Sequence, residues 1–296
     1  MSDVGARPVV TTFPASSRRL TLRPAVVRRA VAHLFLLIGA LTMVLPFVWM
    51  LSTALKGNNA ILVFPPDFFP HPLVWQNFID IFKVVPFSTY LANSARYAVL
   101  ATVGQLLTCS MAAYAFARLR FPGRDLLFLL LVASLMIPYQ VTMIPVFVLM
   151  KYLGWIDTFR PLIIPAWMGG AFGTFMLRQF FLTIPRDLID AAKIDGSNYY
   201  GIYLRIFLPL AGPALATLGV FTFMWSWNDL IGPLIYLNTP LKYTVSIGLA
   251  LFQSKFLTVW GQMMAAALVS LLPIIVVFLL AQKYFVQGIA TTGLRQ

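Results

Sequence analysis

Side chains that commonly catalyse reactions or bind metals are scarce in this chain of 296 residues. Its nine acidic residues are all Asp, its histidines are His33 and His71, and its one cysteine, Cys109, lies in an apolar stretch. These are too few for a typical haem site, a cysteine-based metal cluster or an intrachain disulfide. The sequence also lacks the G-x-x-x-x-G-K-[ST] phosphate loop, the H-E-x-x-H zinc motif and the G-x-S-x-G elbow. We therefore predict a chain with no catalytic residue, no metal site and no cofactor of its own.

The segment 182–207 has the spacing of a short helix that docks on a partner. Thr183 can cap the helix and Pro185 suits its first turn. Asp187 lies near the positive end of the helix dipole, and Gly196 can adopt the left-handed conformation that ends a helix. A helix of about ten residues is too short to be stable alone in water. We therefore expect it to pack against another surface.

One face of this predicted helix is apolar and small. Leu188, Ala191 and Ala192 are spaced i, i+3 and i+4, so they share a side, and the alanines allow a close approach. Arg186 and Asp190 have the i, i+4 spacing of an ion pair. The same spacing also fits an amphipathic helix lying on the membrane surface.

The composition sets the class of protein to which these residues belong. Hydrophobic residues make up 60% of the chain and charged residues 10%, with a mean hydropathy of +0.83. Soluble domains carry about 25% charged residues. The net charge of +13 lies mostly beside apolar runs, which favours membrane lipid over nucleic acid as its partner. We predict a polytopic, all-α integral membrane protein.

A spanning helix needs roughly 20 mostly apolar residues. Residues 1–30 form a basic stretch that we expect to be a mobile cytoplasmic tail, and residues 31–296 form the transmembrane domain. The segment Tyr243–Phe252 is too short to span, so we interpret it as interfacial or re-entrant, with a seventh helix as the competing interpretation. The second, third and sixth of six predicted spans look uninterrupted, whereas the fourth contains glycines and the fifth prolines. The six spans are about 31–51, 91–117, 126–150, 161–181, 208–227 and 263–285.

The distribution of basic residues predicts the orientation. With a cytoplasmic N-terminus, fifteen of the 22 Lys and Arg residues fall on the inside and seven on the outside. Inside segments of membrane proteins carry the excess of positive charge. We therefore predict that both termini are cytoplasmic. The first apolar run lacks a clear small-x-small cleavage site, which favours an uncleaved first helix over a signal peptide.

Two motifs give the chain a family resemblance. The run Asp190-Ala-Ala-x-x-Asp-Gly196, followed by Phe207-Leu-Pro-Leu-x-x-Pro213, resembles the EAA loop of ABC-importer permeases. The family motif usually begins with Glu, and Asp190 here is one methylene shorter. Trp227-Asn-Asp with Pro233 after it, and the C-terminal pattern from Gln282 to Gly288, are similar to carbohydrate permeases of the maltose-G type.

The resemblance implies a permease subunit of a multi-pass bacterial inner-membrane importer that moves a sugar or related carbohydrate by alternating access. Its implied partners are a homologous second permease, a dimer of ATPase subunits that bind ATP and Mg, and an extracytoplasmic solute-binding protein. The loop helix between the fourth and fifth spans would be the coupling helix seated on the ATPase. The residues implied in coupling are Leu188, Asp190, Ala191, Ala192, Asp195 and Gly196. Those implied in C-terminal ATPase contact are Gly288, Thr292, Gly293 and Leu294. Those implied in contact with the binding protein are Gln253, Ser254 and Lys255.

Sugar sites combine aromatic platforms with hydrogen-bonding side chains. The candidates for a substrate path are Asn93, Tyr139, Gln140, Trp225, Trp227 and Asn228. Aromatic residues at a membrane interface have the same appearance in sequence. Two alternatives to the importer interpretation are a self-contained secondary transporter or channel, and a membrane enzyme. The spans are nearly free of the central ionisable residues that ion-coupled transporters use, and the sequence has no D-D-x-x-D run.

Overall fold

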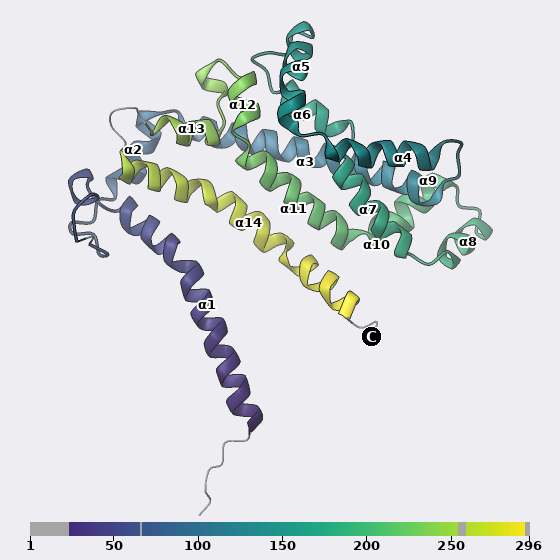
Figure 1. Ribbon diagram of the computed structural model, residues 1–296, viewed down its shortest axis with the longest axis horizontal. Coiled ribbons are helices and arrows are strands. Elements are labelled where there is room, and N and C mark those ends of the chain that lie inside the picture. Colours follow the sequence, from purple (N-terminus) through teal and green to yellow (C-terminus); the bar gives the residue numbers. More distant parts are fainter. Residues whose placement is uncertain (1–23, 66, 254–258, 294–296) are drawn as a thin grey trace, which may run out of the picture. The chain divides into compact units, whose positions relative to one another are not determined.

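The computed structural model describes residues 24–65, 67–253 and 259–293, which fold into helices joined by turns. The chain divides into two compact units, residues 1–49 and 50–296. Figure 1 labels the α-helices. The helices are α1 (Pro24–Ala54), η1 (Asn58–Ala60), α2 (Gln76–Val84), α3 (Phe87–Arg118), α4 (Arg124–Ala133), η2 (Ser134–Met136), α5 (Tyr139–Tyr152), α6 (Arg160–Trp167), α7 (Ala171–Thr183), α8 (Asp187–Ile194), α9 (Tyr199–Ile202), the π-helix η3 (Tyr203–Phe207), α10 (Leu208–Leu210), α11 (Gly212–Asn228), α12 (Ile231–Tyr236), η4 (Pro240–Lys242), α13 (Val245–Leu251) and α14 (Trp260–Gly293).

Three helices have the length and apolarity needed to cross a membrane. They contain the stretches Val31–Ala54 of α1, Phe87–Arg118 of α3 and Trp260–Tyr284 of α14. These stretches cover the first, second and sixth predicted spans. Helix α1 begins at Pro24, inside the predicted tail 1–30, and residues 1–23 lie outside the described residues.

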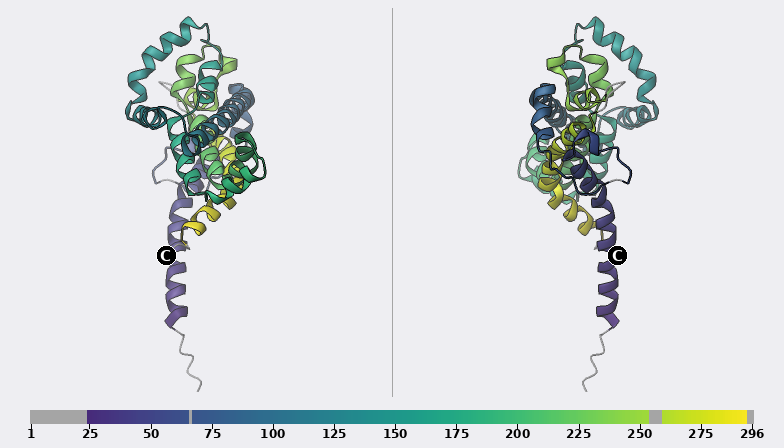
Figure 2. Two further views of the ribbon diagram at one scale, coloured as in Figure 1. Left: turned by 90° about the vertical axis from the view of Figure 1, so that its right-hand side faces the viewer. Right: turned by 90° about the vertical axis from the view of Figure 1, so that its left-hand side faces the viewer.

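The third predicted span, 126–150, is broken, so the prediction of an uninterrupted helix is wrong. The segments Arg124–Met136 and Tyr139–Tyr152 meet at an angle of 102°. Pro138 has no N–H to donate, and the residue before a proline is pushed out of the helical region. Ile137 accordingly is extended, with φ −86° and ψ 113°. Figure 2 shows the bend between α4 and α5 from two sides.

The fourth and fifth predicted spans are also interrupted. The interval 161–181 contains two helices, α6 and α7, separated at Met168–Gly170, where Gly169 has a positive φ of 86°. In the interval 208–227 the chain bends by 75° between Tyr199–Leu210 and α11, beside Pro209 and Pro213. Counting each bent pair as one span gives up to five spans among the described residues, so six crossings remain a prediction.

The second unit is built around helices that lie side by side. Helix α3 packs against α7 and α11, and α11 packs against α14 (Figures 1 and 2). Large apolar side chains are exposed on these helices, as expected for surfaces that face lipid rather than water. The segment 243–252 forms the seven-residue helix α13, which is too short to span and packs against α3 and α14.

Candidate functional site

Helix α8 is the predicted loop helix, and its first turn differs from the prediction. It begins at Asp187 and has eight residues rather than about ten. Thr183 is the last residue of α7, and its hydroxyl donates to the carbonyl of Phe180 at 2.7 Å, so it does not cap α8. Pro185 lies before the helix rather than in its first turn. The competing hydrogen bond inside α7 explains the error, because a threonine hydroxyl bonds readily to a carbonyl of the preceding turn.

The predicted stop of α8 at Gly196 is confirmed. Gly196 has a positive φ of 77°. Its N–H donates to the carbonyl of Lys193 at 3.0 Å, and the N–H of Ser197 donates to the carbonyl of Ala192 at 2.9 Å. This pair of bonds is the Schellman motif that closes a helix and satisfies its last carbonyl groups. The left-handed backbone, and not lack of space, favours glycine at this position, because nothing lies within 4 Å of where a Cβ would be.

Helix α8 has one anchored face and one exposed face. Ala192 is buried, and Ile189 packs beside it, whereas Leu188 and Ala191 are exposed. The predicted grouping of Leu188, Ala191 and Ala192 on a single docking face is therefore wrong. Ile194 is 86% exposed, which adds a large apolar side chain to the outer face.

The charges on α8 pair differently from the prediction. Asp190 lies 4.0 Å from the Nζ of Lys193 rather than pairing with Arg186. Both members of this pair are largely exposed, so the pair contributes little to stability. Asp187, Asp190 and Asp195 are all exposed, which leaves their carboxylates accessible to a partner.

Beneath α8 is an aromatic platform that the sequence did not reveal. Phe181 of α7 and Phe207 of η3 are fully buried and meet edge to face, with ring centroids 5.2 Å apart. Tyr114 of α3 packs against Phe207 at 4.9 Å, and its hydroxyl donates to the carbonyl of Tyr199. Aromatic pairs of this kind add about 0.5–1.5 kcal/mol each beyond burial. The platform joins α3, α7 and η3, and Ala192 packs α8 into the same cluster.

Arg118, the last residue of α3, fixes the linker that leads into α8. Its guanidinium donates to the carbonyls of Phe181 and Ile184, and it lies 5.4 Å from the centroid of the Phe207 ring. Arginine can hold two acceptors and stack on an aromatic ring at once. These contacts tie the linker that precedes α8 to the C-terminal end of α3.

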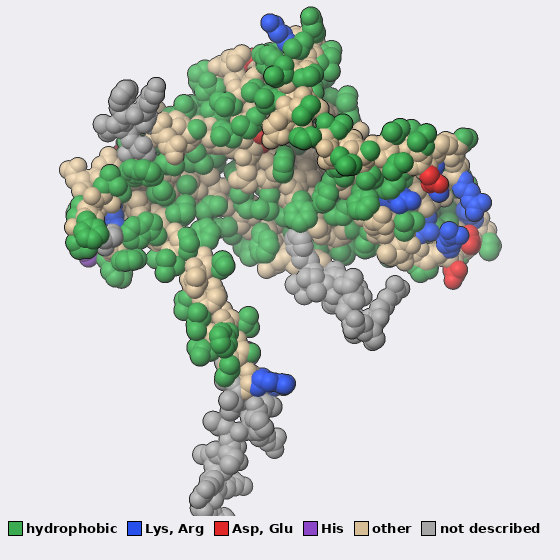
Figure 3. All heavy atoms as spheres, viewed as in Figure 1, with side chains coloured by type: hydrophobic (Ala, Val, Ile, Leu, Met, Phe, Trp, Pro, Cys, Tyr) green, Lys and Arg blue, Asp and Glu red, His purple; other side chains and the backbone are tan. Residues whose placement is uncertain are grey.

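The surface around α8 is charged, unlike the apolar surface of the helices. In Figure 3 the Lys and Arg side chains gather with Asp side chains at the right-hand end, where Figure 1 shows α8. The residues of this end include Arg120, Arg124, Asp125, Arg186, Asp187, Asp190, Lys193 and Asp195. An end rich in charge is typical of a membrane protein's aqueous face.

The other residues implied by the resemblance are partly described. Gly288, Thr292 and Gly293 lie in the last part of α14, and Leu294 lies outside the described residues. Gln253 is exposed and its amide approaches the Sδ of Met263 at 3.9 Å. Ser254 and Lys255 also lie outside the described residues.

Two candidates for the substrate path have polar side-chain groups that are hydrogen-bonded to backbone carbonyls of this chain. The amide of Asn93 donates to the carbonyls of Leu241 and Tyr243 at 2.9 Å each. Trp227 is 3% exposed, and its indole N–H donates to the carbonyl of Ser270 at 3.1 Å. These contacts join α3 and α11 to later segments, which is a packing role.

The remaining candidates are more accessible. Trp225 is 79% exposed and Tyr139 is 48% exposed. Gln140 is exposed, and the exposed Asn228 donates to the carbonyl of Met224 within its own helix. Of these residues, Tyr139 lies at the proline break between α4 and α5.

Asp157 joins two loops on another side of the second unit. Its carboxylate accepts hydrogen bonds from Lys242 at 2.7 Å, from the Thr239 hydroxyl at 2.6 Å, and from the backbone N–H groups of Asn238 and Thr239. The hydrogen bond from Lys242, followed by those from Thr239 and Asn238, lowers the pKa of Asp157 well below its usual range. These bonds close the α5–α6 turn onto the turn after α12, and we call this set of residues the Asp157 clasp.

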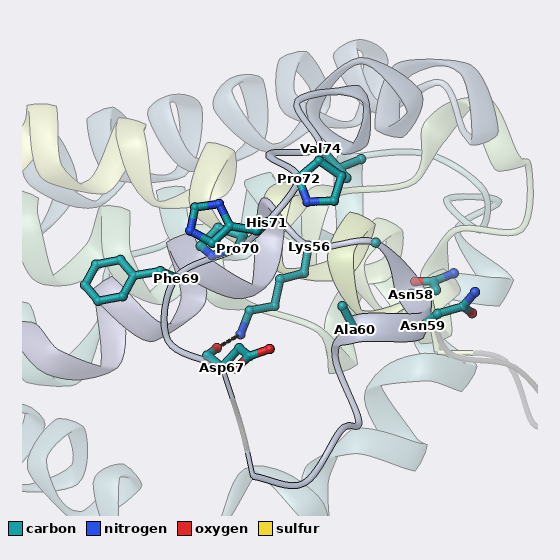
Figure 4. A pocket seen from close by; sticks show the side chains of 11 residues that line it. Lys56, Asn58, Asn59, Ala60, Asp67, Phe69, Pro70, His71, Pro72 and Val74 are labelled. Carbon is teal, nitrogen blue, oxygen red and sulfur yellow. Dashed lines mark hydrogen bonds between the residues drawn. The ribbon is translucent and has the colours of Figure 1, made fainter.

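A pocket of about 330 Å³ lies in the loop after α1, within the second unit. Lys56 crosses it and donates to the carbonyl of Asp67, and Phe69, His71 and Asn58 line its rim (Figure 4). Lys56 is 3% exposed, so its ammonium group is part of the packing of this loop. The pocket belongs to the segment that the sequence marks as rich in proline and aromatic residues.

Helices with exposed apolar surfaces, together with an outward-facing charged loop helix at one end, are features of a membrane protein. The chain belongs to the family of binding-protein-dependent transport system inner membrane components, which it matches over residues 105–291. This membership confirms the predicted importer permease and does not support a self-contained transporter.

The relatives are transport permeases of similar length. The chain is 36% identical to the arabinooligosaccharides transport system permease protein of Halalkalibacterium halodurans, over 82% of this chain and 86% of that protein. It is 34% identical to the sn-glycerol-3-phosphate transport system permease protein of Yersinia pestis, over 87% of this chain and 94% of that protein.

Solved structures share the fold. A chain of a bacterial ABC transporter that imports the acidic polysaccharide alginate superposes with a TM-score of 0.76 at 24% identity, over 93% of this chain and all of that one. A chain of a bacterial alginate ABC transporter in complex with its alginate pentasaccharide-bound periplasmic protein gives 0.61 at 16% identity, over 86% of this chain and 94% of that one.

Proposed function

We propose that the chain is a carbohydrate permease of a bacterial inner-membrane ABC importer, with α8 as the helix that couples it to an ATPase dimer. The observation that carries this proposal is the mounting of α8. One face is anchored through Ala192 to the aromatic platform, while Leu188, Ala191 and Ile194 are exposed. A lever needs both a rigid mount and a free contact face.

The charged end that carries α8 is the proposed cytoplasmic side. Excess positive charge on one side of a membrane protein marks the inside. Gly288, Thr292, Gly293 and Leu294 are proposed to reach the ATPase dimer on this side. A homologous second permease is proposed to cover part of the exposed apolar surface, and ATP and Mg are bound by the ATPase subunits.

The opposite end is the proposed outer side, where a solute-binding protein delivers the carbohydrate. We assign the loops that follow α1 and α12 to this side, and Gln253, Ser254 and Lys255 are the proposed contacts with the binding protein. The carbohydrate assignment rests on the relatives, one of which is named for arabinooligosaccharides. The six-span topology with both termini inside is part of the same proposal.

Co-purification and transport test this function together. The tagged chain, extracted from its native membranes in mild detergent, should co-elute with a nucleotide-binding subunit and a second permease. Proteoliposomes containing this complex and its binding protein should take up arabinotriose only when ATP is supplied inside. Elution of the chain alone in several mild detergents, or uptake driven by an ion gradient without ATP, would contradict the proposal.

A further inference from the structure

Asp229 differs from the other acidic residues that the structure describes. It is half-buried at the C-terminal end of α11, and no Lys, Arg or His nitrogen among the described residues lies within 4.0 Å of its carboxylate. The other described aspartates are ion-paired or exposed. A partly buried carboxylate without a cation is costly in a membrane protein, and such residues mark functional sites.

Neutral donors hold this carboxylate in place. The hydroxyl of Tyr97, on α3, donates to Oδ2 at 3.0 Å, and the N–H of Gly232, on α12, donates to Oδ1 at 3.0 Å. A Cβ at position 232 would lie 2.5 Å from Oδ2, so glycine is needed for the carboxylate to lie there. A residue 132 positions away and one three positions away therefore fix the same acidic group.

The hydrogen-bonding capacity of Asp229 is only half used. An ionised carboxylate has about four acceptor positions, and the two bonds above occupy two of them. The group is partly exposed, so the remaining positions are open to a donor from outside the chain.

Aromatic side chains belong to the elements that meet near this carboxylate. Tyr236 is on α12, the helix that also contributes Gly232, and Tyr139 is the first residue of α5. Tyr236 is buried and stacks on Phe147 at 6.1 Å, which ties α12 to α5. Tyr139 is 48% exposed and so offers its ring and hydroxyl to a ligand.

We propose that Asp229 and Tyr139 contact a neutral carbohydrate during its passage and disfavour anionic substrates. Sugar hydroxyls are donors that fit the open carboxylate positions, and an aromatic ring can pack on a sugar face. A phosphate or uronate group is instead repelled by the carboxylate. Tyr97 and Gly232 are positioning residues that orient Asp229. The inference rests on the proposed function. The relatives are named for a neutral substrate, arabinooligosaccharides, and for an anionic one, sn-glycerol-3-phosphate, and the inference favours the neutral kind.

Binding measured on the complete, nucleotide-free importer complex in nanodiscs tests the contact without its binding protein. Saturation-transfer NMR detects weak binding, and the probes are arabinotriose and the acidic digalacturonate. Asp229→Asn keeps an oxygen acceptor for Gly232 and removes the charge. We expect the affinity for arabinotriose to fall about tenfold, because a hydrogen bond to a charged acceptor is lost, and the affinity for digalacturonate to rise.

Asp80→Asn is the matched control, because Asp80 is on α2 and is paired with Lys83. It should change neither affinity. Tyr139→Leu is a second variant that does not depend on the buried network, and it should weaken arabinotriose binding several-fold. Opposite shifts for the two probes in Asp229→Asn support the contact, since a purely structural role would move both affinities in the same direction. Equal shifts, no shift, or no saturation transfer in a wild-type complex that imports arabinotriose with ATP would overturn it while leaving the proposed function intact.

Discussion

At Gly196 one backbone angle fixes the end of the proposed lever. Its φ of 77° belongs to the left-handed region, where a β-branched side chain is strongly disfavoured. Asparagine tolerates this region better than other side-chain-bearing residues do. Because the space around position 196 is open, a substitution there changes the backbone preference without creating a steric clash.

We predict that Gly196→Val uncouples the importer and that Gly196→Asn largely preserves it. Valine should cost about 1–2 kcal/mol in the left-handed conformation and loosen the end of α8. ATP-driven uptake should then fall by roughly tenfold or more, with normal membrane insertion. Uptake in proteoliposomes and the amount of extracted protein measure the two effects. Normal transport by Gly196→Val would contradict the coupling assignment of α8.

The Asp157 clasp should make the stability of the protein depend on pH in the acidic range. The folded-state pKa of Asp157 is depressed below its ordinary value of 3.8, first by the hydrogen bond from Lys242. The contribution of the clasp to stability is therefore complete above about pH 4 and is lost as the pH falls from there toward the folded-state pKa. Thermal unfolding of the purified protein should show a stability loss in this window that is absent in Asp157→Asn.

Two variants separate the clasp from general acid effects. Thr239→Val removes the hydroxyl donor but keeps the Lys242–Asp157 pair at 2.7 Å, so it should retain most of the acid sensitivity. Lys242→Met should abolish much of it and show non-additive behaviour with Asp157→Asn. An acid-induced loss in Asp157→Asn as large as in the wild type would exclude the clasp as its source.

At the scale of the element, α8 has two faces with separate tasks. Ala192 is buried against the platform and Ala191, one position earlier, is exposed. Overpacking a close-packed site costs typically 1–3 kcal/mol, whereas exposed substitutions away from special features usually lie within about 0.5 kcal/mol. The same substitution at the two positions therefore distinguishes anchoring from docking.

We predict that Ala192→Leu lowers the free energy of unfolding by about 1–3 kcal/mol, whereas Ala191→Leu leaves it nearly unchanged. Ala191→Leu should instead reduce co-purification of the ATPase, because the added bulk lies on the proposed contact face. Unfolding in detergent and pull-down of the complex are the two measurements. A pair of variants with equal stability and equal ATPase recovery would show that α8 has no such division.

Local signals in the sequence predicted the end of α8 well and its beginning poorly. Gly196 ends the helix through its own backbone conformation, so this one residue was enough to predict where α8 ends. Thr183 had two competing partners, a carbonyl acceptor in α7 and the N–H donors of the following helix, and the choice depended on where α7 ended. In the same way, Pro138 carried the signal for the break between α4 and α5, but the continuous apolarity of 126–150 outweighed it in the prediction.

Contacts between distant elements could not be read from the sequence. Trp227 looked like a candidate for sugar binding until the structure placed its indole against Ser270, 43 residues later. Tyr97 and Asp229 are 132 residues apart, and their pairing depends on how α3 lies against α11. Periodicity and composition identify which helices form, but not which side chains meet across them.

At the scale of the whole molecule, charge and apolar surface are segregated within the second unit. The end carrying α8 is rich in charge, while large apolar side chains are exposed along α3, α11 and α14 (Figure 3). Such a surface is stable when lipid, and in part a partner permease, covers the apolar region. The proposed orientation of the chain follows from this segregation, and thiol labelling can test it.

Single cysteines at the two ends should label from opposite sides of the membrane. Native Cys109 is fully buried, so it should remain unreactive in the folded protein. Lys193→Cys on α8 should react with a membrane-impermeant maleimide only in inverted vesicles, and Asn59→Cys in the loop after α1 only in intact spheroplasts. Both positions are exposed in the chain, and the ATPase subunits are stripped from the vesicles before labelling, so failure to label reports sidedness and not burial. The reverse pattern would place α8 outside the cell, where no ATPase could bind it, and would overturn the topology and the coupling role together.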